Sequence, residues 1–295
     1  MNTTGLRYPD ALVSTAWLAD NLDDRNLRIY DCTTFLHYAS DTDKLDRVES
    51  GRSSYNTAHI PGSAFLDLQA DLSDNDSPLR FTILPPEELA ARFAVKGVSD
   101  GTRVILYSRA NMQWATRVWW MLRYLGFDSA AVLDGGWDKW SIEGRTAATE
   151  PVSYTRGTLS INPRPDLFTG KDETCSAIGN ATVCTINALA PGLHSGASDR
   201  YGRPGRIPGS INVPAINLQV GETRNFVKPS ALAKHFEHVG TDRNKRIIVY
   251  CGGGIAATLD AFLLHQLGYE NISVYDNSMS EWANDESLPI EVDDS

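Results

Sequence analysis

The chain of 295 residues contains an internal repeat with a nearly constant offset. Ile207-Pro208-Gly209-Ser210 repeats Ile60-Pro61-Gly62-Ser63, 147 positions later. Val274-Tyr275-Asp276 repeats Val132-Leu133-Asp134 at an offset of 142. An offset this steady indicates a tandem duplication of one folding unit. The length of the chain also fits two domains better than one.

Each copy of the repeat alternates short apolar strands with helices. Val104–Tyr107 and, 143 positions later, Ile247–Tyr250 are typical buried strands, and a helical pattern follows each of them. Such alternation predicts a mostly parallel sheet with helices on both faces. We therefore predict an α/β protein of two tandem domains, residues 1–150 and 165–295. A linker containing Pro151 and Pro163 joins them at about residues 144–164.

Chemistry is suggested by the end of the second buried strand. Tyr250 is followed by Cys251 and by a loop that leads into an apolar helix; the loop is Gly252, Gly253, Gly254, Ile255, Ala256 and Ala257. Open α/β sheets place their ligands at the carboxyl ends of the strands. Glycines let backbone N–H groups turn toward the sulfur, and the helix N-terminus adds a positive dipole end. Both effects favour the reactive thiolate, so we expect a nucleophilic Cys251 rather than an inert buried cysteine.

Composition excludes several other classes of function. The net charge of −10 argues against nucleic acid and anionic membranes as partners, although a local site can oppose the global sign. No apolar run approaches the roughly 20 residues that span a bilayer. The first residues lack the pattern of a secretory signal, so we expect a reducing, cytoplasmic location. No C-x-x-C pair or histidine cluster accompanies the cysteines, so we expect no metal and no cofactor. The four are Cys32, Cys175, Cys184 and Cys251.

The motifs of the two copies resemble those of two-domain rhodaneses, the family of thiosulfate and 3-mercaptopyruvate sulfurtransferases. The similarity extends over nearly the whole chain. Six pieces occur in the family's order and in the duplicated frame. They are His59-Ile60-Pro61-Gly62, Arg117–Leu122, Leu133–Trp137, Ile207–Ser210, Cys251–Ala256 and Ser280-Glu281-Trp282.

The resemblance implies a division of labour between the two domains. Cys251 is the nucleophile of the carboxyl-terminal domain, and Ser108 stands at the equivalent position of a non-catalytic amino-terminal copy. The implied reaction takes sulfane sulfur from a small anionic donor and forms a persulfide on Cys251. A thiol, cyanide or a protein cysteine then accepts the sulfur.

The donor-binding residues depart from the family pattern. Gly253 replaces the serine of mercaptopyruvate-type loops, and Leu189 and Leu193 stand where the family commonly has two arginines. Leucine cannot bind a sulfonate or carboxylate, so other residues must bind the anionic donor. The candidates are His194, Arg200, Arg203 and Arg206, with Arg109 and His59 from the amino-terminal half.

Two alternatives to an active sulfurtransferase follow from the same residues. The uncharged loop and the two leucines also suit a non-catalytic or persulfide-carrier protein with low turnover. Cysteine-dependent phosphatases need an arginine six positions after the cysteine, where this chain has Ala257. Without that guanidinium the loop lacks a bidentate partner for phosphate, which argues against phosphatase activity.

Overall fold

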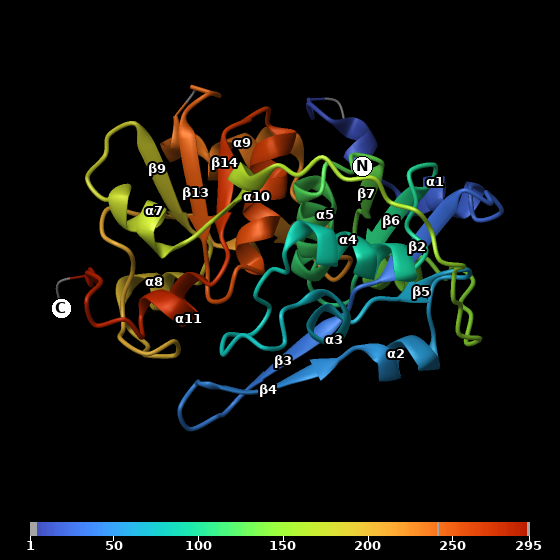
Figure 1. Cartoon of the computed structure of the whole chain (residues 1–295), viewed down its shortest axis with the longest axis horizontal. Helices are drawn as coiled ribbons and strands as arrows, with labels where there is room; N and C mark the ends of the chain where they lie inside the picture. Colours follow the sequence, from blue (N-terminus) through green and yellow to red (C-terminus); the bar gives the residue numbers. More distant parts are fainter. Residues whose placement is uncertain (1–4, 241, 294–295) are drawn as a thin grey trace.

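The computed structural model describes residues 5–240 and 242–293 and contains two halves of the same architecture (Figure 1). Each half has a sheet of five parallel strands, ordered β1-β7-β6-β2-β5 in the first and β8-β14-β13-β9-β10 in the second. Strands in corresponding places of the repeat occupy corresponding places in the two sheets. Both the duplication and the α/β class are therefore confirmed. The expectation of no signal peptide concerns a segment whose residues 1–4 lie outside the described residues.

In the first half, the sheet strands are β1 (Leu12–Val13), β2 (Leu27–Asp31), β5 (Ala64–Phe65), β6 (Arg103–Tyr107) and β7 (Ala130–Leu133). The helices are α1 (Thr15–Asp20), α2 (Arg52–Thr57), α3 (Leu68–Leu72), α4 (Pro86–Val95), α5 (Gln113–Tyr124) and α6 (Gly136–Ile142). The residues at the amino-terminal ends of α1 and α4 explain why these helices begin there. The Ser14 hydroxyl accepts the Trp17 amide at 3.1 Å to cap α1, and Pro86 with two glutamates opens α4.

In the second half, the sheet strands are β8 (Phe168–Thr169), β9 (Val183–Asn187), β10 (Ile211–Asn212), β13 (Arg246–Tyr250) and β14 (Ile272–Tyr275). The helices are α7 (Lys171–Ser176), α8 (Pro191–Ser195), α9 (Pro229–His235), α10 (Ala256–Gln266) and α11 (Ser278–Trp282). The central strand β13 is buried from Ile247 to Tyr250, as its apolar run predicts for a strand covered on both faces.

Two antiparallel ribbons lie outside the main sheets. The first pairs β3 (Thr34–Tyr38) with β4 (Leu45–Ser50), and the second pairs β11 (Gln219–Val220) with β12 (Asn225–Phe226). The β3–β4 hairpin follows β2 in the chain and is not part of the predicted alternation of strands and helices. In Figure 1 this hairpin projects from the first half toward the underside of the second.

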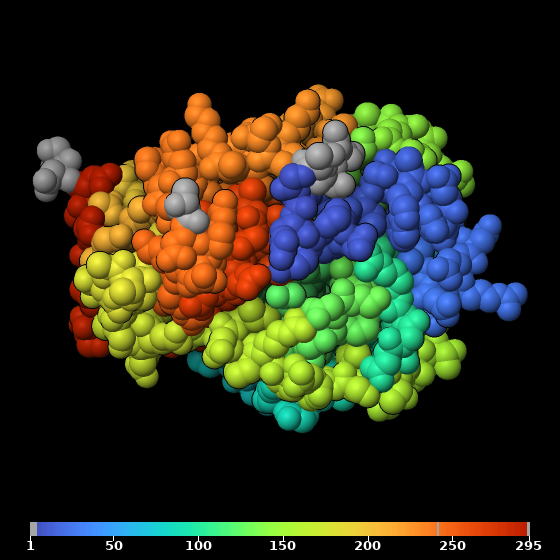
Figure 2. Space-filling view, turned by 90° about the horizontal axis from the view of Figure 1, so that it is seen from above, coloured from blue at the N-terminus to red at the C-terminus, as the bar shows by residue number. Residues whose placement is uncertain are grey.

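The two halves meet along α5 and α10. The Thr116 and Thr258 hydroxyls are 3.1 Å apart, and the Trp119 ring meets the Phe262 ring edge-on at 4.9 Å between centroids. Figure 2 shows the amino-terminal segment in blue against the orange and red surface of the second half. There the Arg7 amide donates to the Gln266 carbonyl at 2.7 Å.

The two aspartates of the repeat each accept a hydrogen bond from the backbone of the opposite half. Asp134, after β7, accepts the Phe226 amide of the second half at 2.9 Å. Asp276, after β14, accepts the Ile83 amide of the first half at 2.8 Å. The carboxyl ends of β7 and β14 are thus each hydrogen-bonded to the backbone of the other half. Burial raises the pKa of Asp134, and its bond to the Phe226 amide opposes that shift.

The segment at 144–164 contains no helix or strand and runs along the first half. The Tyr154 hydroxyl donates to the Gly62 carbonyl at 2.6 Å, and the Gly157 amide donates to the Ala94 carbonyl at 2.8 Å. The domain limits of 1–150 and 165–295 remain a prediction. Within the described ranges, every helix is too short or too polar to cross a bilayer.

Candidate active site

Cys251 directly follows β13 at the carboxyl end of the second sheet, and its side chain is only 2 % exposed. The loop from Gly252 to Ile255 connects it to α10. Two hydrogen bonds fix this loop to α11. The Met279 amide donates to the Cys251 carbonyl at 3.1 Å, and the Ser280 amide donates to the Gly252 carbonyl at 2.7 Å.

Ser278 organises the inner side of the loop. Its hydroxyl accepts the amides of Cys251 at 3.0 Å and Gly254 at 3.2 Å, and it donates to the Tyr275 carbonyl at 2.6 Å. Ser278 adopts φ of +50°, a strained conformation for a residue with a Cβ, and these bonds hold it there. The expectation that the Gly254 amide points at the sulfur is therefore wrong, because that amide bonds Ser278.

The outer side of the loop has amides that remain available. Within the described part of the chain, the N–H groups of Gly252, Gly253 and Ile255 have no hydrogen-bond acceptor. These residues and Ala256 line a cavity together with Cys251, whereas Gly254 and Ala257 do not line it. Unpaired amides at the start of a helix are a ready site for an anionic sulfur.

A buried arginine from the first half supports the loop from behind. Arg117 on α5 donates to the Gly254 carbonyl at 3.2 Å and to the Asp276 carboxylate at 2.6 Å. It also donates to the Phe81 carbonyl at 2.8 Å. One fully buried side chain thus joins the active-site loop, the end of β14 and the segment before α4.

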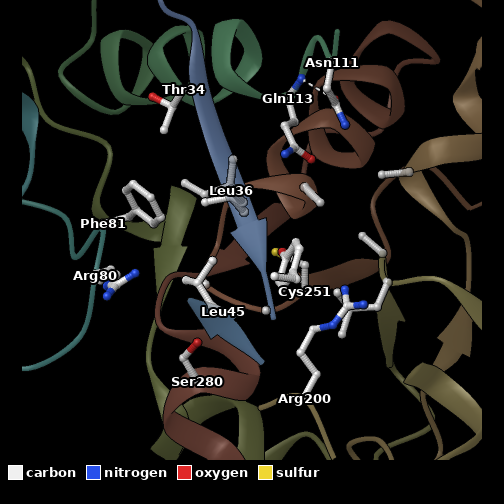
Figure 3. Close-up of a pocket in the computed structure, with 18 of the residues that line it drawn as sticks. Thr34, Leu36, Leu45, Arg80, Phe81, Asn111, Gln113, Arg200, Cys251 and Ser280 are labelled. Atoms are coloured by element: carbon white, nitrogen blue, oxygen red, sulfur yellow. Dashed lines mark hydrogen bonds between the residues drawn. The ribbon is translucent and has the colours of Figure 1, made fainter. Parts of the chain in front are cut away.

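Both halves form the cavity over Cys251, which has a volume of about 660 Å³ (Figure 3). The second half contributes the cysteine loop, Ser280 and the segments around α8 and β10. The first half contributes the β3–β4 hairpin and the segment around Phe81. Leu189 and Leu193, each 8 % exposed, line the cavity, so the two leucines do face the space where donor arginines were expected.

The charged residues that line the cavity are all basic or histidine: His37, Arg80, Arg109 and Arg200. Arg200 pairs with Asp43 of the hairpin, donating to its Oδ2 at 3.0 Å, and stacks on the Tyr38 ring at 4.3 Å. Its hydrogen bond lowers the pKa of Asp43. Arg200 is therefore held and largely neutralised.

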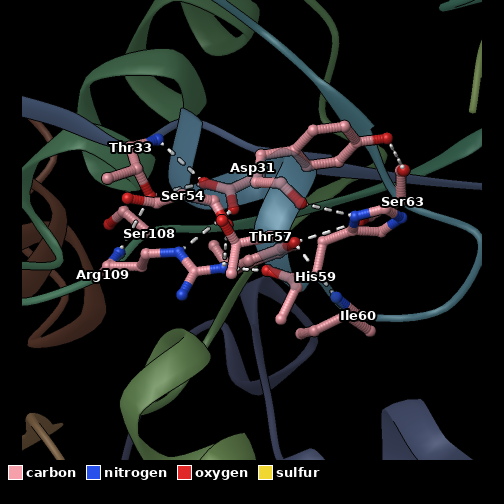
Figure 4. A network of polar contacts seen from close by, with 12 residues as sticks. Asp31, Thr33, Ser54, Thr57, His59, Ile60, Ser63, Ser108 and Arg109 are labelled. Carbon is pink, nitrogen blue, oxygen red and sulfur yellow. Dashed lines mark hydrogen bonds and ion pairs between the residues drawn. The ribbon is translucent and has the colours of Figure 1, made fainter. Parts of the chain in front are cut away.

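Arg109 reaches the cavity from the first half but is also occupied. Its guanidinium stacks on Trp137 at 4.1 Å. It also donates to the Ser54 carbonyl at 3.4 Å and to the Ala58 carbonyl, and Figure 4 shows Arg109 beside Ser54. Its Nε lies 3.7 Å from the buried Asp31 carboxylate. Burial raises the pKa of Asp31, and the Thr33 hydroxyl opposes the shift.

Three other candidates do not line the cavity. Arg203 donates to four backbone carbonyls at the end of α11 and beyond, including Ala283 at 3.1 Å. Arg206 pairs with Glu291 and Asp293 near the carboxyl terminus. His194 is half-buried beside Arg206, and burial lowers its pKa to about 4. The prediction that these residues bind a donor is not supported, because structural partners hold the two arginines.

His59 likewise does not line the cavity over Cys251. It is fully buried in the first half, stacks on Tyr55 at 4.0 Å and contacts the Tyr55 carbonyl at 2.7 Å (Figure 4). Ser108, the counterpart of Cys251, donates to the Asn111 carbonyl at 2.7 Å. These contacts give both residues structural roles.

Two cavity residues were missed by sequence reasoning. Arg80 is exposed and has no hydrogen bond or ion pair to any residue in the described ranges. Tyr201 covers Gly252 so closely that a Cβ on Gly252 would lie 2.2 Å from the phenol oxygen. Burial raises the pKa of Tyr201, with the nearby Tyr38 and Cys251 adding to the shift, so its hydroxyl stays a neutral donor. Neither residue belongs to a motif, so no local signal could have identified them.

No cluster of metal-ligating side chains occurs in residues 5–240 and 242–293. All four cysteines are free thiols, and Cys175 is the most exposed of them. Among the residues that the structure describes, the site therefore offers a single cysteine, amides without an acceptor and one arginine without a partner.

Comparison with known proteins places this geometry in context. A model of the rhodanese-like domain matches residues 14–143 and 197–285. Thiosulfate/3-mercaptopyruvate sulfurtransferase 2 of Arabidopsis thaliana is 30 % identical, with 95 % of this chain and 86 % of the relative aligned. The 3-mercaptopyruvate sulfurtransferase of Escherichia coli K12 is 31 % identical over 95 % of this chain and 97 % of its own. The crystal structure of SseA from Escherichia coli superposes with a TM-score of 0.77 at 29 % identity, covering 91 % of this chain and 98 % of that one.

Proposed function

This chain belongs to the rhodanese family and is a sulfurtransferase, and on that basis we propose that it moves sulfane sulfur through a persulfide on Cys251. The donor is a small anion of the thiosulfate or 3-mercaptopyruvate type, and the acceptor is a thiol or cyanide. One observation carries the proposal. Cys251 faces a cavity beside amides that have no other acceptor among the described residues.

In the first step the Cys251 thiolate attacks the sulfur to be transferred, which is the outer sulfur of thiosulfate or the thiol sulfur of 3-mercaptopyruvate. A bond forms between Sγ and that sulfur while the donor's own bond to it breaks, and the electron pair leaves with the remainder of the donor. In the second step a nucleophile takes the terminal sulfur and regenerates the thiolate. The two half-reactions make the cycle ping-pong.

The loop stabilises charge at both stages. Thiolate and persulfide are both anions, and the amides of Gly252, Gly253 and Ile255 can donate to them because they line the same cavity and have no acceptor among the described residues. The Tyr201 hydroxyl adds a neutral donor on the same side. Arg117 and Ser278 do not touch the sulfur; they hold the loop in place.

The Cys-Gly-x-Gly form of the loop favours a mercaptopyruvate-type donor over thiosulfate. Mercaptopyruvate carries one carboxylate, and Arg80 is the cavity arginine that has no partner within the described residues. Thiosulfate carries two negative charges, and the other two cavity arginines are already bound to protein acceptors.

A persulfide carrier is the second candidate, and the burial of the sulfur favours it. At 2 % exposure, a persulfide on Cys251 would be shielded from water and from casual thiols. A carrier would accept one sulfur atom and release it slowly to small acceptors.

Intact-protein mass spectrometry after incubation with thiosulfate, or separately with 3-mercaptopyruvate, tests the proposal. We expect a gain of one sulfur atom in the wild type and in Cys175→Ser, and none in Cys251→Ser. Continuous turnover with cyanide then separates an enzyme from a carrier, which loads but does not cycle. Loading that persists in Cys251→Ser would contradict the proposal.

A further inference from the structure

Many side chains in the walls of the cavity are apolar, although thiosulfate, a small inorganic dianion, has no apolar group to bind them. Leu36 and Leu45 come from the β3–β4 hairpin, Phe81 from the segment before α4, and Leu189 and Leu193 from the second half (Figure 3). Ile216 lines the same cavity and is 63 % exposed. An apolar group that enters the cavity can cover this exposed isoleucine and remove its side chain from water.

The size of the cavity points the same way. Pockets for organic ligands of drug size occupy roughly 300–1,000 Å³, and the volume of about 660 Å³ over Cys251 lies within that range. Thiosulfate would leave most of this space filled with water against leucine and phenylalanine side chains. An organic body of matching shape would displace that water favourably.

The charged side chains around the cavity leave one guanidinium available for a negative charge on the ligand. No aspartate or glutamate lines it. Arg200 is paired with Asp43, and Arg109 is stacked on Trp137 and bonded to backbone carbonyls. Arg80 alone has no partner in the described ranges, and Figure 3 draws it across the cavity from Arg200. A donor with a single negative charge matches one free guanidinium.

We propose that the cavity selects, in preference to thiosulfate, an organic sulfane-sulfur donor with an apolar body and one negative charge. This inference rests on the proposed persulfide chemistry of Cys251 and names the class of donor. With a thiosulfonate, R–SO₂–S⁻, Sγ attacks the outer sulfur and the sulfur–sulfonyl bond breaks. The electron pair leaves with the sulfinate R–SO₂⁻, and no external oxidant or reductant is needed.

Three probes that share the reactive group isolate the role of the body: thiosulfate, methanethiosulfonate and benzenethiosulfonate. The rate of persulfide formation on Cys251 is measured for each and divided by the rate of the same donor with free cysteine. This normalisation removes intrinsic reactivity. We expect the normalised rate to rise from thiosulfate through the methyl to the phenyl compound, by about tenfold or more across the series, since tenfold corresponds to about 1.4 kcal/mol of binding.

Matched variants assign the preference to the cavity. Leu45→Ser should lower the normalised rate with benzenethiosulfonate several-fold and leave the rate with thiosulfate unchanged. Ile142→Ser removes a comparably apolar side chain that is 57 % exposed away from the cavity, and it should change neither rate. Arg80→Gln should raise KM for benzenethiosulfonate with little change in kcat, the mark of a lost binding contact.

The outcomes separate the two proposals. If thiosulfate loads Cys251 at a normalised rate equal to or above that of the phenyl compound, the apolar donor is excluded and the persulfide function stands. The same conclusion follows if Leu45→Ser and Ile142→Ser behave alike. If none of the three compounds loads Cys251, the apolar donor is excluded, and the persulfide function also fails if 3-mercaptopyruvate does not load the cysteine.

Discussion

The guanidinium of Arg117 donates to the carboxylate of Asp276 at 2.6 Å across the boundary between the two halves. Arg117 is fully buried, and its other nitrogen reaches the carbonyl of Gly254 in the cysteine loop. The same carboxylate accepts the Ile83 amide, next to the segment that lines the cavity. This pair therefore couples the packing of the halves to the geometry around Cys251.

Replacing Arg117 by methionine should destabilise the protein strongly. The change leaves Asp276 buried without its cation, which typically costs about 3–5 kcal/mol of the free energy of unfolding. Urea denaturation measures this loss. Arg92→Gln, which breaks an exposed i,i+4 pair with Glu88, should cost only about 0.5 kcal/mol. Equal losses for the two variants would show that the buried pair has no special role in joining the halves.

The two outer glycines of the cysteine loop should tolerate alanine very differently. A Cβ on Gly252 would lie 2.2 Å from the Tyr201 phenol oxygen, so that ring or the loop must move. A Cβ on Gly253 has only the Ser280 hydroxyl near it, at 3.8 Å, an ordinary contact. We expect Gly252→Ala to lower the rate of Cys251 persulfide formation by about tenfold or more, in line with ~1.4 kcal/mol of misplacement. Gly253→Ala should keep most of the rate. A reversed order would mean that Tyr201 does not pack over the loop as described.

Asp43→Asn should make Arg200 available to anions. The hairpin carboxylate now neutralises Arg200, and asparagine keeps the shape of the side chain at a position with φ of +55°. With the charge removed, we expect KM for thiosulfate to fall by about tenfold or more, since a hydrogen bond to a charged group contributes about 1.5–3 kcal/mol and about 1.4 kcal/mol corresponds to tenfold. Steady-state kinetics measures the change. Lys44→Ala, which breaks the neighbouring pair with Asp199, should leave KM as it is. An unchanged KM in Asp43→Asn would mean that Arg200 does not reach the donor.

His265 should make the protein less stable in mild acid. Burial lowers its pKa to about 3, and Arg123 adds to the shift, whereas the unfolded chain protonates this histidine near 6.5. Between these values the unfolded chain binds a proton that the folded chain does not. The stabilising contribution is therefore complete above pH 6.5 and is lost as the pH falls toward 3. The slope from this group approaches about 1.4 kcal/mol per pH unit.

His265→Phe provides the test of that slope, because phenylalanine keeps an aromatic ring against Tyr8, whose ring stacks on the histidine at 4.0 Å. Urea denaturation at pH 7, 6 and 5 should show a smaller loss of stability in the variant than in the wild type. The two proteins should differ little in slope above pH 7. Identical slopes from pH 7 to pH 5 would contradict the assignment.

The fold and the place of Cys251 could be predicted because their signals are local or periodic. The repeat fixed the number of units, and the alternation of strands and helices gave the parallel sheets. The cysteine follows its strand directly, so the position at the sheet edge needs no knowledge of distant residues. Even there, the direction of the Gly254 amide depended on Ser278, which is 24 positions further along the chain.

The donor-binding residues could not be predicted, because the role of each arginine depends on which groups it pairs with in the folded protein. Arg203 and Arg206 have the right charge and lie in the right segment, but carbonyls and carboxylates near the carboxyl terminus already hold them. Arg80 belongs to the other half and reaches the cavity only through the packing of the two domains. The hairpin that lines the cavity pairs β3 with β4, and the charged residues of β4, such as Asp46 and Glu49, conceal the strand pattern.

The hairpin belongs to the copy of the repeat that has lost the nucleophile. Part of the cavity that receives the donor is thus formed by the half that lacks the cysteine. Substitutions at Leu36 or Leu45 change which molecules fit without altering the loop that carries the sulfur. The shape of the cavity can therefore be altered from the hairpin while the half that holds Cys251 keeps its sequence.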